Sequence, residues 1–429
     1  MRFVYDESMP SDLLEFLKAK MHLDDSDNLI PGGRYHNSKD FMSFPNLGRA
    51  ELEYKKHQPL QHKDLKAYES ILDIVAHKDV LLHYPYQSFG YFIDLLREAA
   101  IDPKVTSIKI TIYRLAKDSK VVNALINAAK NGKKVTVVLE LQARFDEEAN
   151  IKWSNVLNEE GVKVLFGVPG LKVHSKLCVI SRKEAAGTRH YASIGTGNYN
   201  EKTSRIYSDF ALFTSNKKIT GEANRLFKIF EGPIQQPYTY RYLVPSPTQL
   251  RNKLIELIGN EIDNVQEGKE AYITLKMNSL IDQQMIEQLY RASKAGVKIK
   301  LIVRGICGVV PGVKGLSENI EAISILDKFL EHARVFIFGN HGKELMYISS
   351  ADWMGRNLDN RVEITCPILD DTIRQEINDM IEIQWSDNVK ARCLDSSMEN
   401  KFKQPESEHE KPIRSQFELY NYYKNQLKQ

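Results

Sequence analysis

A histidine and a lysine two residues apart are the first candidates for chemistry in this sequence. They lie in Gly170-Leu-Lys-Val-His-Ser-Lys-Leu-Cys-Val-Ile-Ser-Arg182, where His174 and Lys176 begin an apolar run. If Lys176–Ser181 is a strand, alternate side chains share a face, so the two residues point the same way. A neutral imidazole is a nucleophile near neutral pH, and an adjacent ammonium can bind a phosphoryl oxygen. The structural alternative for this pair is a surface strand end.

A loop of small residues follows this pair. It reads Gly195-Thr-Gly-Asn-Tyr-Asn200, and such a loop lets backbone N–H groups approach an anion closely. Both motifs suit the same phosphate, which favours a functional role for His174. Asn198 is a candidate phosphate-binding residue in this loop.

Arginines recur where strands are expected to end. Arg114, Arg144 and Arg304 each follow a short run that is typical of a strand. Ligands of α/β sheets bind at the carboxyl ends of strands, and the planar guanidinium suits bidentate binding of phosphate oxygens. Each arginine alone could be a solvated charge. Three at equivalent positions favour a polyanion or a nucleoside triphosphate as the ligand.

The second half of the chain repeats the plan of the first. Eleven residues separate Asn198 from Asp209, and eleven separate Asp352 from Glu363. An internal repeat of about 160 residues indicates two like domains. A pseudo-twofold pair places one face of each domain on a shared cleft, which is a common place for a site.

Each half therefore offers one histidine and one loop of small residues. His332-Ala-Arg334 corresponds to His174-Ser-Lys176, and Ser349-Ser-Ala-Asp-Trp353 corresponds to the loop that contains Asn198. One histidine could attack phosphorus while the other donates a proton to the leaving oxygen or accepts one from it. The alternative for His332 is a helix-end histidine that the helix dipole stabilises.

Three further residues could belong to the site. Tyr207 could stack on a purine or hydrogen-bond a phosphate, and it could also be a core tyrosine. Arg361, at the start of an expected strand, is a candidate phosphate ligand. His341, in Gly339-Asn-His-Gly-Lys343, imitates the His-x-Lys spacing, but its glycine and asparagine neighbours favour a loop.

Composition and missing motifs narrow the function. The net charge of +3 over 429 residues is too small to argue for nucleic-acid or membrane binding. The four cysteines are widely spaced, and Cys178, Cys307 and Cys366 lie in apolar runs. This pattern predicts buried thiols of a reducing cytoplasm and no disulfide or zinc framework. No apolar run reaches the ~18–20 residues that span a bilayer. No P-loop and no transition-metal spacing occur, so phosphoryl transfer would use a covalent histidine, and Mg²⁺ would come with the phosphates.

The expected elements are those of an α/β protein with two domains. Strands alternate with helices in both halves, which predicts mixed sheets flanked by helices. We expect domains at 62–242 and 243–429, and we expect residues 1–61 to be too short and polar to form a core. Helices are expected within 65–99 and over 119–130, 147–160, 221–230, 281–294, 371–385 and 415–427, and residues 317–332 are expected to be mostly helical.

Longer motifs then give the sequence a family resemblance. The motifs are Val173-His-Ser-Lys176, Leu141-Gln-Ala-Arg-Phe-Asp-Glu-Glu-Ala-Asn150, Gly195–Asn200, Ile302-Val-Arg-Gly305 and Ser349-Ser-Ala-Asp-Trp-Met354. They resemble the bacterial polyphosphate kinases of the phospholipase-D-like type over essentially the whole chain. The resemblance implies two phospholipase-D-like domains, preceded here by a remnant of a middle domain in residues 1–61. It also implies ATP-dependent, reversible extension of a polyphosphate chain by an enzyme that is oligomeric and often membrane-associated.

The resemblance also implies roles for individual residues. His174 would become phosphorylated, with Lys176 beside it, and His332 would be the second essential histidine near the nucleotide phosphates. The remaining residues would bind the nucleotide: Tyr207 and Arg304 would contact ATP, and Arg114 and Arg144 would line the magnesium–triphosphate site.

The sequence departs from the family pattern in two ways. The family's N-terminal domain and most of its middle domain are missing, so we expect a fragment or a truncated product with impaired activity. The phospholipase-D pattern has an Asp five residues after its Lys, where this chain has Ser181. That difference fits phosphoryl transfer from a nucleotide better than diester hydrolysis. The alternatives are a phospholipase-D-type phosphodiesterase and a non-catalytic module that binds polyphosphate or ATP.

Overall fold

Two compact units, Met1–His57 and Gln58–Gln429, make up this computed structural model. It describes the chain except residues 1, 25–26, 35–40, 42–43, 67–68, 117, 141–146, 233–237, 398, 406, 408–410 and 429. In the first unit, β1 (Arg2–Asp6) pairs in parallel with β2 (Asn28–Gly32). That unit also contains α1 (Ser11–Met21) and the 3-10 turn η2 (Ala50–Leu52), and α1 buries none of its residues.

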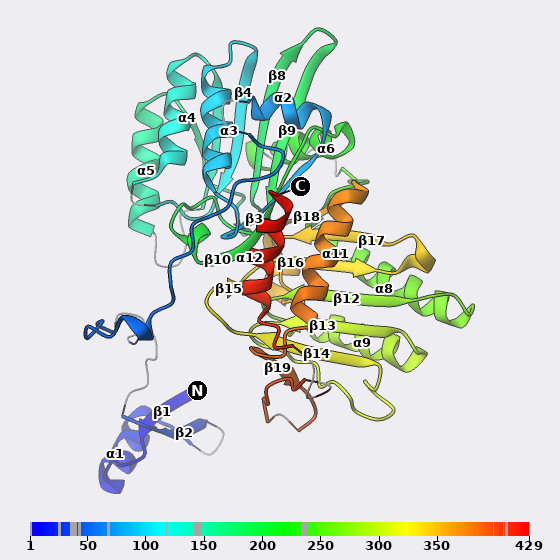
Figure 1. The fold of residues 1–429 in the computed structure, drawn as a ribbon. Helices are drawn as coiled ribbons and strands as arrows, with labels where there is room; N and C mark the ends of the chain where they lie inside the picture. The colour runs from blue at the N-terminus through cyan, green and yellow to red at the C-terminus, as the bar shows by residue number, and fades with distance from the viewer. Residues whose placement is uncertain are drawn as a thin grey trace. The chain divides into compact units, whose positions relative to one another are not determined.

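The first half of the larger unit is built on a mixed sheet (Figure 1). Its own strands are β3 (Val80–Tyr84), β4 (Val105–Ile112), β5 (Lys134–Leu139), β6 (Lys163–Leu165), β8 (Leu177–Glu184), β9 (Gly187–Gly195) and β10 (Tyr207–Thr214). The helices that flank it are α2 (Ile71–His77), α3 (Gly90–Ile101), α4 (Lys120–Lys130), α5 (Glu147–Glu159), α6 (Lys217–Leu226) and α7 (Lys228–Glu231), with the short turn η3 (Thr203–Arg205) before β10.

The second half repeats this arrangement with a second mixed sheet. Its own strands are β11 (Val244–Ser246), β12 (Tyr272–Met277), β13 (Lys298–Val303), β14 (Ile320–Ile325), β16 (Arg334–Phe338), β17 (Leu345–Ser349), β18 (Arg361–Pro367) and β19 (Ala391–Leu394). Its helices are α8 (Leu250–Gln266), α9 (Gln283–Ala295), α10 (Gly355–Asp359), α11 (Asp371–Trp385) and α12 (Ser415–Gln426), with the turn η4 (Asn340–Gly342). Figure 1 shows α11 and α12 side by side over this sheet.

Helix ends in the two halves follow the same rules. The Ser119 side chain caps α4 by accepting from the Val122 N–H, and the Asp282 side chain caps α9 by accepting from the Met285 N–H. Such caps satisfy N–H groups that have no partner inside the helix. Gly296 ends α9 with a φ of 104°, a left-handed conformation that glycine adopts at little cost.

Apolar packing joins the halves into one unit. One buried cluster lies between the first sheet and α2 to α4, and another lies between the second sheet and α8 and α9. A third cluster takes residues from both halves, including Ile219 of α6, Ile377 of α11 and Leu419 of α12. The faces of the two sheets that are not covered by the first two clusters therefore share one core.

The predicted mixed sheets flanked by helices are confirmed, but one local prediction is wrong. Residues 317–332 were expected to be mostly helical, and they form β14 and the short strand β15 (Leu330–Glu331). β14 pairs with β13 and β19, and all its side chains except that of Glu321 are buried, so its apolar run resembles a buried helix. Between the helices of 65–99, residues 80–84 form the fully buried strand β3.

Candidate active site

Each half of the larger unit places a short strand in the sheet of the other half. β7 (Lys172–Val173) pairs in parallel with β18, and the N–H groups of His174 and Ser175 both donate to the Val362 carbonyl, at 3.0 and 2.8 Å. In the reciprocal exchange β15 pairs in parallel with β10. As a result, each candidate histidine comes from one half and is positioned by the backbone of the other.

The second exchange has the same hydrogen bonds as the first. The N–H groups of His332 and Ala333 both donate to the Ser208 carbonyl, at 3.1 and 2.8 Å. His332 therefore follows a strand, and the alternative of a helix-end histidine is wrong. His174, Ser175 and Lys176 lie between β7 and β8, so the strand expected over 176–181 begins at Leu177.

A carboxylate from the opposite half binds each histidine ring. Nδ1 of His174 is 2.9 Å from Oε2 of Glu363, and Nδ1 of His332 is 2.8 Å from Oδ2 of Asp209. These carboxylates directly follow Val362 and Ser208 in the chain. The strand exchange therefore fixes both the backbone of each histidine and the partner of its ring.

Further hydrogen bonds hold the two carboxylates. Glu363 accepts from Ser350 Oγ at 2.5 Å and from Asn357 Nδ2 at 2.6 Å. Asp209 accepts from Thr196 Oγ1 at 2.6 Å. Ser350 and Thr196 come from the two corresponding loops, so these loops contact the carboxylates that orient the histidines. We expected the loops to contact an anionic ligand directly.

Gly197 shows how closely one loop approaches its carboxylate. A Cβ atom at this position would lie 2.1 Å from Oδ2 of Asp209, which is far inside van der Waals contact. Only glycine fits here, and the reason is the close approach of the Asp209 carboxyl group.

The electrostatics favour a neutral imidazole at His174. Burial lowers the pKa of this ring to about 3, although the Glu363 carboxylate opposes the shift. Burial would raise the pKa of Glu363, but His174, Lys176 and the Ser350 hydroxyl together bring it below its usual value. Glu363 is therefore ionised at neutral pH, and Nδ1 must carry the proton that it shares with Glu363. The lone pair of His174 is then on Nε2.

The cations beside the two histidines differ. Lys176 is buried, burial lowers its pKa to about 7, and its ammonium group donates to the carbonyl of His174. Arg334 occupies the corresponding place in the second half. It forms an ion pair with Asp352 at 3.0 Å, and its Nη1 lies 3.3 Å from Nε2 of His332. Burial also lowers the pKa of His332, and the charge of Arg334 adds to this effect.

Arg304 and Tyr207, expected to contact ATP, lie around His332. Arg304 donates from Nε to the Glu331 carbonyl at 2.9 Å and to Oδ1 of Asn278 at 3.1 Å. The ring centroid of Tyr207 is 5.1 Å from that of His332. Both residues are half-buried, so each retains surface that a ligand could contact.

Arg361 and Arg114 belong to the His174 side. Arg361 pairs with Lys172 in the exchanged strand, and its charge contributes to the lowered pKa values of His174 and Lys176. Arg114 follows β4 and lies 5.7 Å from the ring of Tyr113, which in turn packs edge-on against His174 with centroids 5.0 Å apart. Arg144 lies outside the described residues.

Asn198 lies in the loop after β9 and is half-buried. Among the described residues, no group hydrogen-bonds its buried Oδ1 atom. Its counterpart Asp352 accepts from the Asn278 N–H at 2.8 Å and pairs with Arg334. Asn198 thus belongs to the loop that contacts Asp209 through Thr196. Its side-chain oxygen could accept a hydrogen bond from a ligand.

The described part of the chain contains no group of three or more His, Cys, Asp or Glu residues that could hold a metal ion. The polar groups around the two histidines are chiefly cations and two carboxylates that already bind imidazole. These donors do not fit a metal held by the protein itself. A divalent cation here would have to arrive with the phosphate oxygens of a substrate.

Sequence reasoning missed the roles of Glu363 and Asp209. Both were noticed for their equal spacing from Asp352 and Asn198, but they were not assigned to the site. The signal was that spacing: eleven residues in each half, within the two segments that were aligned as a repeat. Their pairing with histidines of the opposite half depends on the strand exchange, which no local pattern reveals.

Comparison with known proteins identifies relatives over most of the chain. Residues 70–236 match the family model described as polyphosphate kinase C-terminal domain 1, and residues 243–416 match polyphosphate kinase C-terminal domain 2. The chain is 51% identical over 424 residues to a polyphosphate kinase of Vibrio vulnificus and 49% identical over 426 residues to that of Escherichia coli K12. Each alignment covers 99% of this chain, with 60% of the first relative and 62% of the second. The chain thus spans about three fifths of the length of these relatives.

Solved structures agree with these matches. The structure of polyphosphate kinase from Porphyromonas gingivalis matches with a TM-score of 0.88 and 43% identity, covering all of this chain and 65% of that one. Phosphatidylserine synthase from Haemophilus influenzae matches with a TM-score of 0.51 and 10% identity, covering 82% of this chain and 94% of that one. The second likeness concerns the fold alone, and the expected phospholipase-D-like fold is confirmed.

Proposed function

This chain belongs to the polyphosphate kinase family, and we propose that it transfers the γ-phosphate of ATP to the end of an inorganic polyphosphate chain. We assign the covalent step to Nε2 of His174. ADP and a polyphosphate longer by one phosphate would be the products, and the transfer is reversible. The family membership and the geometry of the two half-sites support this assignment.

The observation that carries the proposal is the state of the His174 ring. Glu363 holds Nδ1 with its proton, burial keeps the ring neutral, and 12% of the side-chain surface remains exposed. Among the described residues, no group hydrogen-bonds Nε2. A neutral imidazole with a free and oriented lone pair is the form that attacks phosphorus.

The bond changes balance in two steps. In the first, the Nε2 lone pair forms a bond to the γ-phosphorus, and the bond from that phosphorus to the bridging oxygen breaks with its electron pair going to ADP. The Nδ1 proton of the resulting phosphoimidazole remains shared with Glu363, which offsets the positive charge that develops on the ring. In the second step, a terminal oxygen of polyphosphate attacks the phosphorus, and the N–P bond returns its electron pair to Nε2.

The cations around the histidines would stabilise the negative charge of the transferring phosphoryl group. Lys176 and Arg361 lie on the His174 side, and Arg304 lies on the His332 side. Preorganised donors of this kind typically contribute ~3–4 kcal/mol each to the transition state. We propose that His332 contacts the nucleotide phosphates and handles the proton of the leaving or attacking oxygen.

Several parts of the proposal concern partners. ATP, ADP and polyphosphate are the proposed ligands, nucleic acid is not, and a homo-oligomer is the proposed assembly. Mg²⁺ is proposed to enter with the nucleotide, with Arg114 and Arg144 near its triphosphate. We propose a cytoplasmic location with association at a membrane surface, and within the described residues no helix is both long and apolar enough to cross a bilayer.

Labelling with γ-³²P-ATP tests the covalent step. The wild-type chain should acquire an acid-labile, base-stable label that polyphosphate or ADP removes, and His174→Ala should acquire none. His341→Ala is the matched control, because His341 has the same His-x-Lys spacing on an exposed turn and its loss should leave the label unchanged. Tight binding of ATP and polyphosphate by a wild-type chain that never becomes labelled would support a non-catalytic binding module instead.

A further inference from the structure

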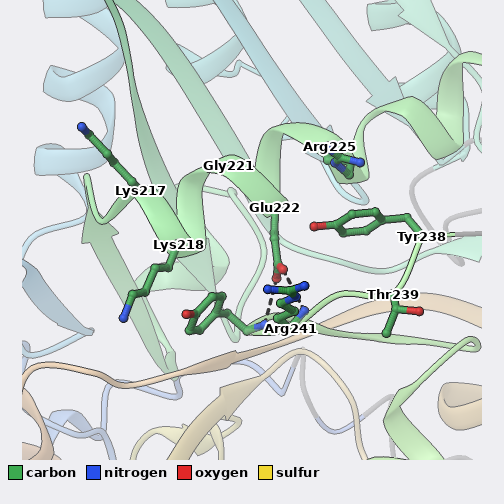
Figure 2. A pocket seen from close by; sticks show the side chains of 9 residues that line it. Lys217, Lys218, Gly221, Glu222, Arg225, Tyr238, Thr239 and Arg241 are labelled. Carbon is green, nitrogen blue, oxygen red and sulfur yellow. Dashed lines mark hydrogen bonds between the residues drawn. The ribbon is translucent and has the colours of Figure 1, made fainter. Parts of the chain in front are cut away.

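A polar cavity lies away from the two histidines. It has a volume of about 700 Å³ and lies between α6 and the segment 238–242 that leads into β11 (Figure 2). None of the proposed catalytic residues lines it. Four of its nine lining side chains are cations, namely Lys217, Lys218, Arg225 and Arg241, and one is a carboxylate, Glu222.

The carboxylate does not neutralise these cations. Glu222 is buried, and its two oxygens accept three backbone N–H groups, from Arg241, Tyr242 and Leu243, at 2.7–3.0 Å. Figure 2 shows its side chain directed at the Arg241 segment. Glu222 therefore ties this segment to α6, and the four cations form no ion pair with any residue that the structure describes.

The placement of two lysines adds to the positive potential. Lys217 and Lys218 occupy the first turn of α6, which has no acidic residue. The N-terminal end of a helix carries a partial positive charge, so cations there are unfavourable by about 0.3–1 kcal/mol each. A bound anion would remove this penalty and would also meet the α6 dipole with the favourable sign.

Two aromatic rings hold cations in place at the cavity. The Arg225 guanidinium lies 4.0 Å from the ring centroid of Tyr238, and the Lys218 ammonium lies 5.3 Å from that of Tyr242. Such cation–π contacts reduce the freedom that the cations would lose on binding a ligand. Because both tyrosines already pair with the cavity's own cations, the cavity is suited to charge and not to the stacking of bases.

We propose that this cavity is a secondary site for a phosphate polyanion, and specifically for a distant segment of the polyphosphate chain whose end reacts at His174. The ligand identity rests on the proposed function, while the anion site itself rests on the cavity. A thin, flexible chain with one negative charge per phosphate can enter a recess of this size and contact all four cations. Holding the growing chain at a second point would slow its release between transfers through effective concentration.

The test compares two charge-matched variants of the full chain. In one, Lys217, Lys218, Arg225 and Arg241 all become Ala. In the control, four exposed cations elsewhere, Lys152, Lys183, Arg291 and Lys314, become Ala, so that the net charge changes equally. Binding is measured with fluorescent long-chain polyphosphate at several salt concentrations, and binding of tripolyphosphate is measured in parallel.

The cavity variant should bind the long chain at least about tenfold more weakly than the control. For the cavity variant, the slope of log K against log salt concentration should become less negative by about 3, because four phosphate contacts are lost. Labelling of His174 by ATP should stay normal, so that this result separates the cavity from the proposed catalytic step. Equal affinity of the two variants for long-chain polyphosphate would overturn the proposal. So would a cavity variant that loses only binding to anionic phosphatidylserine vesicles, since that result would assign the cavity to a lipid surface.

Discussion

The two histidine half-sites have the same scaffold and different chemistry. In each, the histidine directly follows an exchanged strand, two consecutive N–H groups donate to one carbonyl, and Nδ1 contacts a carboxylate of the opposite half. The difference lies in the cation two residues after the histidine. Lys176 turns to the backbone carbonyl of His174, whereas Arg334 reaches within 3.3 Å of Nε2 of His332.

This difference in the cation favours separate roles for His174 and His332, although the internal repeat places the two histidines at equivalent positions. Nη1 of Arg334 lies 3.3 Å from both ring nitrogens of His332, and its positive charge makes this ring a poorer nucleophile. The Nε2 lone pair of His174 remains available. Under the proposed mechanism, a Lys-to-Arg difference would give a duplicated fold one covalent histidine and one supporting histidine.

A second difference concerns the residues just after β5 and β13. Glu140 accepts from the N–H of Val173 at 3.0 Å, and Arg304 donates to the carbonyl of Glu331 at 2.9 Å. Each therefore fixes the residue immediately before a histidine, one as an acceptor and the other as a donor. The same task is done with opposite charges, so at this one position a cation is present only in the second half-site.

The largest expected effect is a difference between the two histidine substitutions in covalent labelling. His174→Ala should lose the covalent label and at least roughly 10⁴-fold of turnover, as expected for loss of a nucleophile. His332→Ala should keep the label while turnover falls by roughly 10²- to 10⁴-fold, the range for loss of a general acid–base group. The label is counted after gel filtration, and turnover is the ATP-dependent formation of polyphosphate. Label that persists in His174→Ala and vanishes in His332→Ala would reverse the assignment.

Substitution of Glu363 should reduce labelling more than substitution of Asp209, with smaller losses than those expected for the two histidines. Glu363→Gln keeps the shape but allows the amide to donate to Nδ1, which moves the imidazole proton to Nε2 and removes the lone pair. We expect the rate of labelling to fall by roughly 10³-fold, by the tautomer argument known from catalytic triads. Asp209→Asn should cost on the order of tenfold in turnover with little change in labelling. Circular dichroism and thermal melting check that both variants fold, and equal losses of labelling would contradict two separate roles.

The sequence predicted some features of the fold and of the candidate site and missed others. Helix 371–385 was predicted to the residue, because its Asp370 cap and apolar period are local signals. His174, Lys176, His332 and Arg304 were predicted as site residues from motifs and from the repeat. The ring partners Glu363 and Asp209 lie 189 and 123 residues from their histidines. Those pairs, like strand β14, are decided by tertiary pairing that a local pattern does not contain.

The pH dependence of labelling tests the difference between Lys176 and Arg334. Burial lowers the pKa of Lys176 to about 7, so its ammonium form is present below that pH and is lost as pH rises through it. The rate of labelling at low ATP should therefore fall above about pH 7, by up to tenfold per pH unit. Bound triphosphate favours the charged form, so the fall at saturating ATP should lie at higher pH. Lys176→Arg, which copies the second half, should remove this alkaline fall, and a flat wild-type profile from about pH 6 to 9 would contradict the role.

The smallest expected effect concerns Gln416 of α12, which contacts the strand that precedes His332. The buried Gln416 accepts from the Phe329 N–H, and its amide donates to the Phe329 carbonyl and to Oε1 of Glu331, each at 2.8 Å. Gln416→Leu leaves these groups without partners, which should lower the free energy of unfolding by about 2 kcal/mol. Because the exchanged strand before His332 loosens, turnover should fall a few-fold while labelling of His174 keeps its wild-type rate.

Lys424→Ala, on the exposed face of the same helix, is the control for that change and should leave both rates and the melting temperature unaltered. Equal losses of labelling and turnover in Gln416→Leu would mean that α12 stabilises the whole unit without favouring one half-site. A selective loss of turnover would show that the two histidines can be loosened separately. The exchange of strands would then couple the halves in structure while leaving each histidine its own support.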